Sequence, residues 1–299
     1  MNKILFIGCN DDQIPYLREL KNRELYVIGT DINSKAPGLK LCDRFYNIAY
    51  DQFAELIEIG NKEQFTKSDY IFTASAQFAH LGAAIFAGKF GIKYPPQKTI
   101  QICLDKSKFY RYFKQNNIPI PATCFIEDEK KLISEINNFG KNKNYFLKSD
   151  QSKNPNYIYN FNGNNVPLNN INWEKDRYFQ KYYILQEEFL GTHVRLNIFG
   201  DEYNYYPFDI SKGFDLTINQ ELLDSIIIHL KQIITSLSLS SWLIKFDIIV
   251  HNEKWVALDI GLDPPYRMLN YYINNNLDFY TSYIDQYLFK NYTYFEMDR

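Results

Sequence analysis

Two aspartates interrupt apolar strands near the end of the chain, and their spacing is suited to chemistry. Asp247 lies within the apolar run of residues 245–250, Asp259 lies within the run 255–260, and residues 251–254 read as the turn of an antiparallel hairpin. A carboxylate in a strand otherwise fit for burial is costly unless a positive charge or a metal compensates it. Two interpretations stay open here. Either the carboxylates meet solvent or a lysine, or they hold Mg²⁺ and leave positions for water and nucleotide phosphates.

Lysines and acids upstream could act on the same ligand. Lys106 lies in a helix that opens the second part of the chain, and Lys148 ends an apolar strand. Most lysines are solvated surface charges, but a lysine that ends a buried strand is placed to contact a polyanion. Glu187 and Glu188 stand beside a strand end and a glycine, where a hinge between two lobes could form.

These side chains need a scaffold, and the first hundred residues alternate short apolar strands with helices. The pattern predicts strands at 4–8, 24–31, 45–48 and 70–74, and helices at 13–21, 53–59 and 79–90. Such alternation predicts an open parallel sheet with helices on both faces, a Rossmann-like α/β domain. Tyr94-Pro95-Pro96 ends the domain, because two prolines continue neither a helix nor a central strand. We place the boundary near residue 97.

The second part, residues 98–299, is predicted to form two α+β lobes at about 98–180 and 181–299. Helices are expected at 99–117, 127–138, 219–237 and 279–287. Strands are expected at 123–126, 145–148, 183–189, 193–199, 202–208, 243–250 and 255–260. Residues 149–177 are rich in Asn, Ser and Lys and show little periodicity, which indicates a mobile loop and a short hairpin.

Composition argues against several classes of function. The 299 residues carry 33 Lys+Arg against 35 Asp+Glu, a formal charge of −2. Nucleic-acid binding through a broad face needs clustered basic residues, so no nucleic-acid partner is expected. No long apolar run or signal-peptide pattern is visible, so we expect a cytoplasmic protein without a membrane partner. The four cysteines are far apart without ligand spacing and are expected to be buried free thiols, at Cys9, Cys42, Cys103 and Cys124.

A dinucleotide site in the first domain is an alternative chemistry. Gly8 follows the first strand and Asp31 follows the second, the arrangement in which an acid binds ribose. The turn at residues 8–12 lacks the GxGxxG pattern and carries two acids that would repel pyrophosphate, so an NAD-dependent oxidoreductase is the weaker interpretation. Among the histidines, only His193 falls near the proposed site, and a structural role is favoured for it.

Taken in order, the motifs resemble the ATP-grasp superfamily, of the carboxylate–amine ligase type, over nearly the whole chain. Residues 31–46 are similar to its N-terminal preATP-grasp domain. Residues 105–106 and 117–121 resemble the family's Asp-Lys helix and its Gly-Ile-Pro-x-Pro exit, here Asn-Ile-Pro-Ile-Pro. Residues 146–148 match the strand whose lysine contacts phosphate, and residues 186–191 match the hinge strand. The fold class implied is a preATP-grasp domain followed by a two-lobed α+β ATP-grasp domain.

The resemblance implies that ATP is a ligand and assigns residues to it. Lys106 and Lys148 would contact the phosphates. The nucleoside would be held by the four residues that form the hinge, Glu187, Glu188, Phe189 and Leu190. The implied reaction is attack of a substrate carboxylate on the γ-phosphoryl group, followed by displacement of phosphate by an amine.

The resemblance also implies a Mg²⁺ site and two arginines. Asp247 and Asp259 match the acidic metal ligands, and Asp263 is a substitute third ligand. Arg195 would stabilise charge on the transferred phosphoryl group. Arg267 could bind the substrate carboxylate as a fork, or form a surface salt bridge.

The sequence departs from the family pattern in three respects. The loop at residues 149–156 lacks the glycines that let backbone amides approach phosphates. Gly261 stands where the family has an asparagine ligand, and Asp259 where it has a glutamate. The alternative is therefore a catalytically weak ATP-binding sensor of the same fold. The expected partners are a small-molecule carboxylate and an amine, and a homodimer is the candidate assembly.

Overall fold

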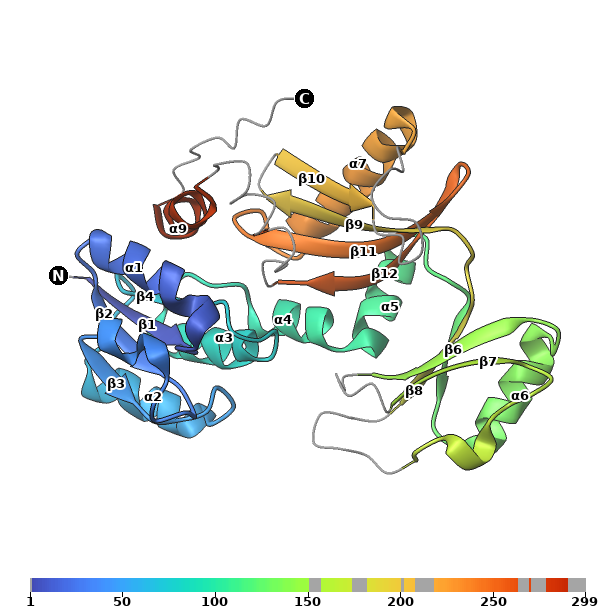
Figure 1. Cartoon of the computed structure of the whole chain (residues 1–299), viewed down its shortest axis with the longest axis horizontal. Coiled ribbons are helices and arrows are strands. Elements are labelled where there is room, and N and C mark those ends of the chain that lie inside the picture. The colour runs from blue at the N-terminus through green and yellow to red at the C-terminus, as the bar shows by residue number, and fades with distance from the viewer. Residues whose placement is uncertain are drawn as a thin grey trace.

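A computed structural model of the chain describes residues 2–150, 157–173, 182–199, 202–207, 218–262, 269 and 278–289. In these residues twelve strands form three four-stranded sheets (Figure 1). Figure 1 shows the sheet of β1–β4 at one end of the molecule and the sheet of β5–β8 at the other, with the sheet of β9–β12 between them and above. We call these the first, second and third sheets.

The first sheet is parallel, with its strands in the order β3-β2-β1-β4. Its strands are β1 (Lys3–Ile7), β2 (Tyr26–Thr30), β3 (Arg44–Tyr46) and β4 (Tyr70–Thr73). Ile4 and Phe6 share a core with the helix α1 (Ile14–Asn22). Leu5 and Ile7 face the other way, into a core with α2 (Phe53–Lys62) and α3 (Ala79–Phe90). The alternation of strands and helices predicted this arrangement correctly, because strands covered on both faces are continuously apolar.

A helix from the far end of the chain packs on the layer that covers the first sheet. α9 (Phe279–Phe289) packs against α1, and Figure 1 shows it beside that helix. Tyr283 is 1% exposed and belongs to the core around Phe6. The guanidinium of Arg23 bonds the Asp285 carboxylate, with an Nε–Oδ1 distance of 2.7 Å. The sequence predicted this helix but not the partner that it covers.

The helix predicted at residues 99–117 is broken in two. α4 (Gln97–Leu104) ends at Asp105, and α5 (Lys106–Gln115) begins at the next residue. Asp105 has an extended backbone, and its Oδ1 accepts hydrogen bonds from the N–H groups of Ser107 and Lys108 at 2.8 and 3.2 Å. The prediction of one continuous helix was therefore wrong, because this aspartate caps the second helix.

The second sheet is antiparallel, with the order β5-β8-β6-β7. Its strands are β5 (Thr123–Ile126), β6 (Asn144–Ser149), β7 (Ile158–Asn162) and β8 (Tyr183–Glu187). The helix α6 (Glu129–Phe139) contributes Leu132 and Ile136 to its core. β7 lies in the polar stretch for which a loop and a short hairpin were predicted, and it pairs with β6, which precedes that stretch.

The third sheet is also antiparallel, with the order β10-β9-β11-β12. Its strands are β9 (Thr192–Phe199), β10 (Glu202–Pro207), β11 (Leu243–His251) and β12 (Lys254–Gly261). Leu196 and Phe246 share a core with α4, α5 and α7 (Gln220–Ser236). Side chains alternate across a strand, so Lys245 and Asp247 lie on the opposite face of β11 from Phe246. The third sheet thus has an apolar face and a face that carries charges.

No helix in the described part of the chain is both long enough and apolar enough to cross a membrane.

Candidate functional site

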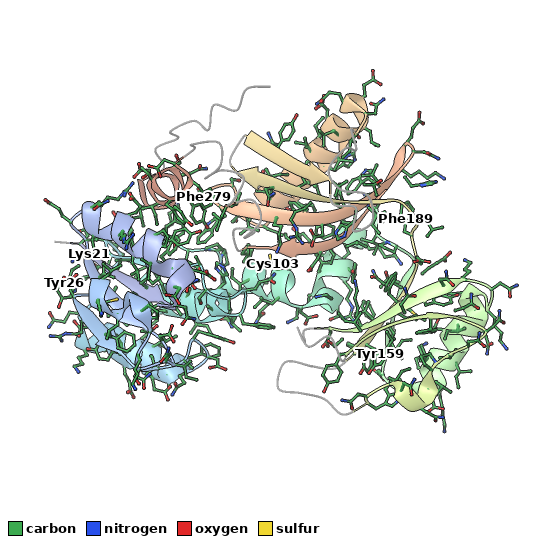
Figure 2. All side chains as sticks on the ribbon, viewed as in Figure 1. Lys21, Tyr26, Cys103, Tyr159, Phe189 and Phe279 are labelled. Atoms are coloured by element: carbon green, nitrogen blue, oxygen red, sulfur yellow. The ribbon has the colours of Figure 1, made fainter. Side chains whose placement is uncertain are left out.

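Four residues singled out in the sequence line one cavity. Lys106, Lys148, Asp247 and Asp259 contribute to the walls of a cavity of about 400 Å³. They come from α5, β6, β11 and β12, so the cavity lies where the second and third sheets meet the helix pair α4–α5. Cys103, labelled in Figure 2, also lines it, on α4 where that helix meets β12. Its volume falls in the range of small-molecule sites.

Three charged side chains form a row across the third sheet. Asp247 lies opposite Arg195 of β9 on one side and opposite Asp259 of β12 on the other. Residues directly opposite in a sheet point to the same face. Arg195 donates from Nε to Oδ1 of Asp247 at 2.7 Å and from Nη2 to Oδ2 at 2.9 Å. This bidentate pair fixes the plane of the Asp247 carboxylate.

The surroundings of Asp247 keep it ionised. Burial disfavours the charged form, but the neighbouring His193, the hydrogen bonds from Arg195 and the charges of Arg195 and Lys245 outweigh burial and hold the pKa of Asp247 well below its usual range. The Nε2 atom of His193 lies 3.7 Å from Oδ1. Each carboxylate oxygen accepts one bond from Arg195, and each has a further lone pair that a cation could use.

Lys106 stands at the start of α5, facing the second carboxylate. Its Nζ lies 3.9 Å from Oδ1 of Asp259. Its backbone N–H donates to the carbonyl of Asp150 at 2.9 Å, which joins the beginning of α5 to the end of β6. The break at Asp105 therefore has a consequence for the site, because it places Lys106 in the first turn of a helix that begins at the cavity.

Lys148 is anchored by a tyrosine that the sequence did not single out. Its Nζ donates to the hydroxyl of Tyr110 at 2.9 Å, and that hydroxyl donates to the carbonyl of Leu258 at 2.6 Å. Leu258 is the extra residue of a bulge in the pairing of β11 with β12, directly before Asp259. Tyr110 thus connects the lysine of the second sheet to the acidic strand of the third.

The pKa of Lys148 is lowered to about 7. Burial is the main cause because it disfavours the ammonium form, and the charge of Lys106 adds to it. Asp259 and Asp247 act in the opposite direction but do not compensate. Two lysines that converge without enough negative charge between them are suited to a ligand that brings several negative charges.

Gln77 connects the part of the chain around the first sheet to β12. It lies between β4 and α3 and lines the cavity. Its Nε2 donates to the carbonyl of Ile260 at 2.9 Å and approaches the carbonyl of Cys103 at 3.4 Å. Neither Gln77 nor Tyr110 carries a motif, so only the tertiary structure identifies them. His193, for which a structural role was favoured, also lines the cavity.

The hinge residues lie outside this cavity as far as the described residues define it. Glu187 ends β8, and its Oε2 accepts from Nζ of Lys143 at 2.8 Å. Glu188 accepts from Asn144, and Leu190 is 69% exposed. Figure 2 shows Phe189 on the connection between the second and third sheets. The structure therefore places these residues on the connection between the second and third sheets, and not with Lys106 and Asp259.

A magnesium ion fits the carboxylates that are present. No three His, Cys, Asp or Glu side chains gather into a metal site within the described ranges. Mg²⁺ is commonly held by one or two carboxylates together with substrate phosphates and water, and Asp247 and Asp259 supply that number. Asp263 and Arg267 lie outside the described residues, as does most of the polar loop after Lys148.

A lysine fills the space beside Gly261. Lys245 lies opposite Gly261 in the pairing of β11 with β12. A Cβ on Gly261 would stand 2.6 Å from Cε and 2.9 Å from Nζ of Lys245. An asparagine at this position would therefore have to displace the end of the lysine side chain. Lys245 lies on the same face of β11 as Asp247.

Comparison with solved structures identifies proteins that share the fold of this chain. No protein-family profile and no curated protein matches the chain, but solved structures do. Phosphoribosylglycinamide synthetase from Anaerococcus prevotii superposes with a TM-score of 0.71 at 14% identity, covering 96% of this chain and 75% of that one. N5-carboxyaminoimidazole ribonucleotide synthetase from Thermotoga maritima gives 0.70 at 16% identity, covering 96% and 76%.

A third structure is similar and was solved with ligands. It is the biotin carboxylase domain dimer of 2-oxoglutarate carboxylase from Hydrogenobacter thermophilus, in complex with MgADP, ADP and bicarbonate. The TM-score is 0.76 at 14% identity, and the match covers 98% of this chain and 71% of that one. The chain therefore has the ATP-grasp fold, with an α/β parallel-sheet domain followed by two antiparallel sheets. The fold class predicted from the sequence is confirmed.

Proposed function

We propose that the protein is an ATP-dependent carboxylate–amine ligase. In the proposed reaction a substrate carboxylate attacks the γ-phosphoryl group of ATP, and an amine then displaces phosphate from the acyl phosphate to form an amide, leaving ADP. The observation that carries the proposal is the convergence of Lys106, Lys148, Asp247 and Asp259 on one cavity. Phosphoryl transfer requires little covalent chemistry from a protein, so charge and positioning are the contributions expected.

The structures that share the fold support this class of reaction. They include two synthetases and an L-amino acid ligase from Bacillus licheniformis. Several were solved with ADP or MgADP. Their names support ATP as the nucleotide and ligation as the reaction class, while the carboxylate and the amine of this protein are left to experiment.

The two lysines would bind the phosphates. Lys106 begins α5, with its Nζ 3.9 Å from Oδ1 of Asp259, and Nζ of Lys148 is held by the hydroxyl of Tyr110 before a ligand arrives. A bound polyphosphate would favour the charged form of Lys148 and remove the repulsion from Lys106. Preorganised cations of this kind stabilise negative charge that develops on the transferred group.

The two aspartates would hold the magnesium ion. Asp247 is oriented by Arg195, and Asp259 faces Lys106. When bound, Mg²⁺ neutralises phosphate charge and orients the nucleotide. Asp263 stays a proposed third ligand. Because Arg195 bonds both oxygens of Asp247, we propose that it orients this ligand in addition to the charge stabilisation predicted from the sequence.

The remaining predicted residues keep their proposed roles. The hinge would bind the nucleoside through Glu187, Glu188, Phe189 and Leu190, and Arg267 would bind the substrate carboxylate. We propose a first domain of residues 1–97 and an ATP-grasp domain of 98–299. The pairing of β8 with β5 and β6 favours a division between the lobes after Glu187. A cytoplasmic location and a homodimer are also retained as proposals.

The proposal is tested by thermal unfolding with ligands. Saturation with MgATP at a hundred times the dissociation constant stabilises by about 2.7 kcal/mol, which for a chain of 299 residues raises the midpoint by roughly 4 °C. The variant Asp259→Asn should lose this shift. Glu253→Gln changes an exposed acid in the turn of the same hairpin and should retain it.

Two outcomes separate the alternatives, the first from thermal unfolding and the second from an additional assay of ADP release. A shift with NAD and none with MgATP would contradict the proposal and favour the oxidoreductase. A shift with MgATP, but no release of ADP in the presence of any carboxylate and amine, would favour the catalytically weak sensor.

A further inference from the structure

Two cysteines that are far apart in the sequence meet over β2, an inner strand of the first sheet. Cys9 follows β1, and Cys42 follows the short helix η2 (Pro37–Leu41). Both sulfur atoms lie over Gly29 of β2. A Cβ on Gly29 would stand 2.4 Å from Sγ of Cys42 and 3.0 Å from Sγ of Cys9. A glycine within a strand often marks a close approach of another group, and here the two thiols share the space that it leaves.

Hydrogen bonds hold the two cysteines in this arrangement. The carbonyl of Cys9 accepts from the N–H of Gly38 at 2.8 Å, and the thiol of Cys42 reaches the carbonyl of the same Gly38 at 3.5 Å. The thiol of Cys9 lies 3.7 Å from the carbonyl of Thr30. Cys9 is fully buried and Cys42 is half-buried, so a small reagent reaches Cys42 first.

The surroundings of the pair shift the pKa values of the two thiols in opposite directions. Hydrogen bonding with the Cys9 thiol lowers the pKa of Cys42, an effect that burial and Asp43 oppose and that Lys21 assists. The same interaction raises the pKa of Cys9, and burial and Asp31 raise it further. Cys42 is therefore the member of the pair that ionises, and the thiolate is the nucleophilic form of cysteine.

We propose that Cys9 and Cys42 form a redox-active dithiol that hydrogen peroxide oxidises to a disulfide. The Cys42 thiolate attacks one peroxide oxygen, so that an S–O bond forms, the O–O bond breaks, and hydroxide leaves. Sulfur is oxidised to the sulfenic acid while peroxide is reduced. The Cys9 sulfur then attacks the Cys42 sulfur, the S–S bond forms, and the sulfenic oxygen leaves with the Cys9 proton as water. A dithiol reductant reverses the reaction by thiol–disulfide exchange.

The other two cysteines provide internal controls. Cys103 is buried, and burial raises the pKa of its thiol. Cys124 is half-buried like Cys42, but burial and the charge of Glu135 raise the pKa of its thiol to about 12. At neutral pH both are held in the less reactive thiol form. The proposal is independent of the ligase activity, because its readout is the oxidation state of named cysteines.

The experiment maps the four cysteines by differential alkylation and mass spectrometry. The reduced full-length protein is treated with hydrogen peroxide, free thiols are blocked with one isotope of N-ethylmaleimide, and dithiothreitol followed by a second isotope then labels the reversibly oxidised thiols. The second label should appear on Cys9 and Cys42 together, and a peptide that links them should be found without reduction. The first label should remain on Cys103 and Cys124.

Variants test the order of the two steps. Cys9→Ser should stop at a sulfenic acid on Cys42, which dimedone traps. Cys42→Ser should leave Cys9 reduced at the same peroxide dose. Cys124→Ser is the matched control and should form the disulfide as the wild type does.

The proposal is overturned if Cys124 is oxidised before any linked Cys9–Cys42 peptide forms. Oxidation of Cys9 in Cys42→Ser at the wild-type rate would overturn it as well. The labelling of the wild-type protein involves no substitution, so it tests the proposal even if a variant fails to fold.

Discussion

Nucleotide binding at the cavity is predicted to take up a proton at Lys148. Burial and the charge of Lys106 lower the pKa of this lysine to about 7, so above pH 7 it is mostly neutral in the free protein. A polyphosphate bound beside it favours the ammonium form and returns its pKa toward the ordinary value of about 10.4. Between these two values the free protein must gain a proton in order to bind, and affinity should fall as the pH rises.

The size of the effect follows from the two pKa values. Well above pH 7 each pH unit should weaken binding about tenfold, or ~1.4 kcal/mol. Between pH 7.5 and pH 9.5 the dissociation constant of MgATP should therefore rise roughly 70-fold. Below pH 7 the lysine is charged in both states, and its contribution to the pH dependence should disappear.

Isothermal titration calorimetry checks this linkage directly. Titrations at pH 8.5 in buffers with different ionisation enthalpies should show uptake of nearly one proton per nucleotide. Lys148→Arg carries a side chain that stays charged, so its affinity should be nearly constant over this pH range. Lys131→Arg changes an exposed lysine of α6 and should behave as the wild type. Equal pH dependence in wild type and Lys148→Arg would show that Lys148 is not the group that takes up the proton.

Three further predictions concern stability, each measured by urea unfolding. Arg195→Leu leaves the Asp247 carboxylate without its bidentate partner and should lower the free energy of unfolding by about 2–3 kcal/mol at pH 7, less than for a fully buried pair because both side chains are partly exposed. Because the pKa of Asp247 is depressed in the folded protein, this difference should shrink as the pH falls below about 4. A constant difference down to pH 2 would contradict this prediction. Gly261→Asn should be only mildly destabilising, by about 0.5–1 kcal/mol, because the atoms that it displaces are the flexible end of Lys245. Adding Lys245→Ala should make the cost of Gly261→Asn smaller; strict additivity would show that the two residues do not interact. Tyr283→Ala should cost about 3–4 kcal/mol by opening the core between α9 and the first sheet, and a loss below 1 kcal/mol would mean that α9 does not cover that sheet.

Local sequence patterns were sufficient to predict most of the secondary structure. Buried parallel strands are continuous apolar runs, and the amphipathic helices between them show a clear period, so the first sheet could be predicted. The break at Asp105 was missed because hydrophobic periodicity continues through it. The signal that marks the break is the capping preference of aspartate, which competes with a helical assignment only when the cap geometry is known.

The residues of the candidate site could be predicted where a charged side chain interrupts or ends an apolar strand. Asp247 and Asp259 stand out as charges within apolar strands, and Lys148 stands out at the end of one. The pairing of Asp247 with Arg195 depends on the register of β9 against β11, and strand register across a long connection cannot be determined from the sequence alone.

Contacts between distant segments were not predictable. Tyr110 is one aromatic residue among many on an amphipathic helix, and only packing brings its hydroxyl to Lys148 and to the Leu258 carbonyl. Cys9 and Cys42 meet because β1, β2 and η2 converge over Gly29. The same holds for α9, whose apolar face fits any hydrophobic partner and whose position on the first sheet follows from the tertiary fold.

We propose that the cavity activates a carboxylate with ATP, and trapping the acyl phosphate shows whether it does. Hydroxylamine replaces the unknown amine, pools of small carboxylates are supplied with MgATP, and both hydroxamate and ADP are measured. We expect equal amounts of hydroxamate and ADP with at least one pool, and neither product with Asp259→Asn. Hydroxamate formation that persists in Asp259→Asn would contradict the assignment of the site, and a wild-type protein that binds MgATP but yields neither product with any pool would contradict the ligase activity.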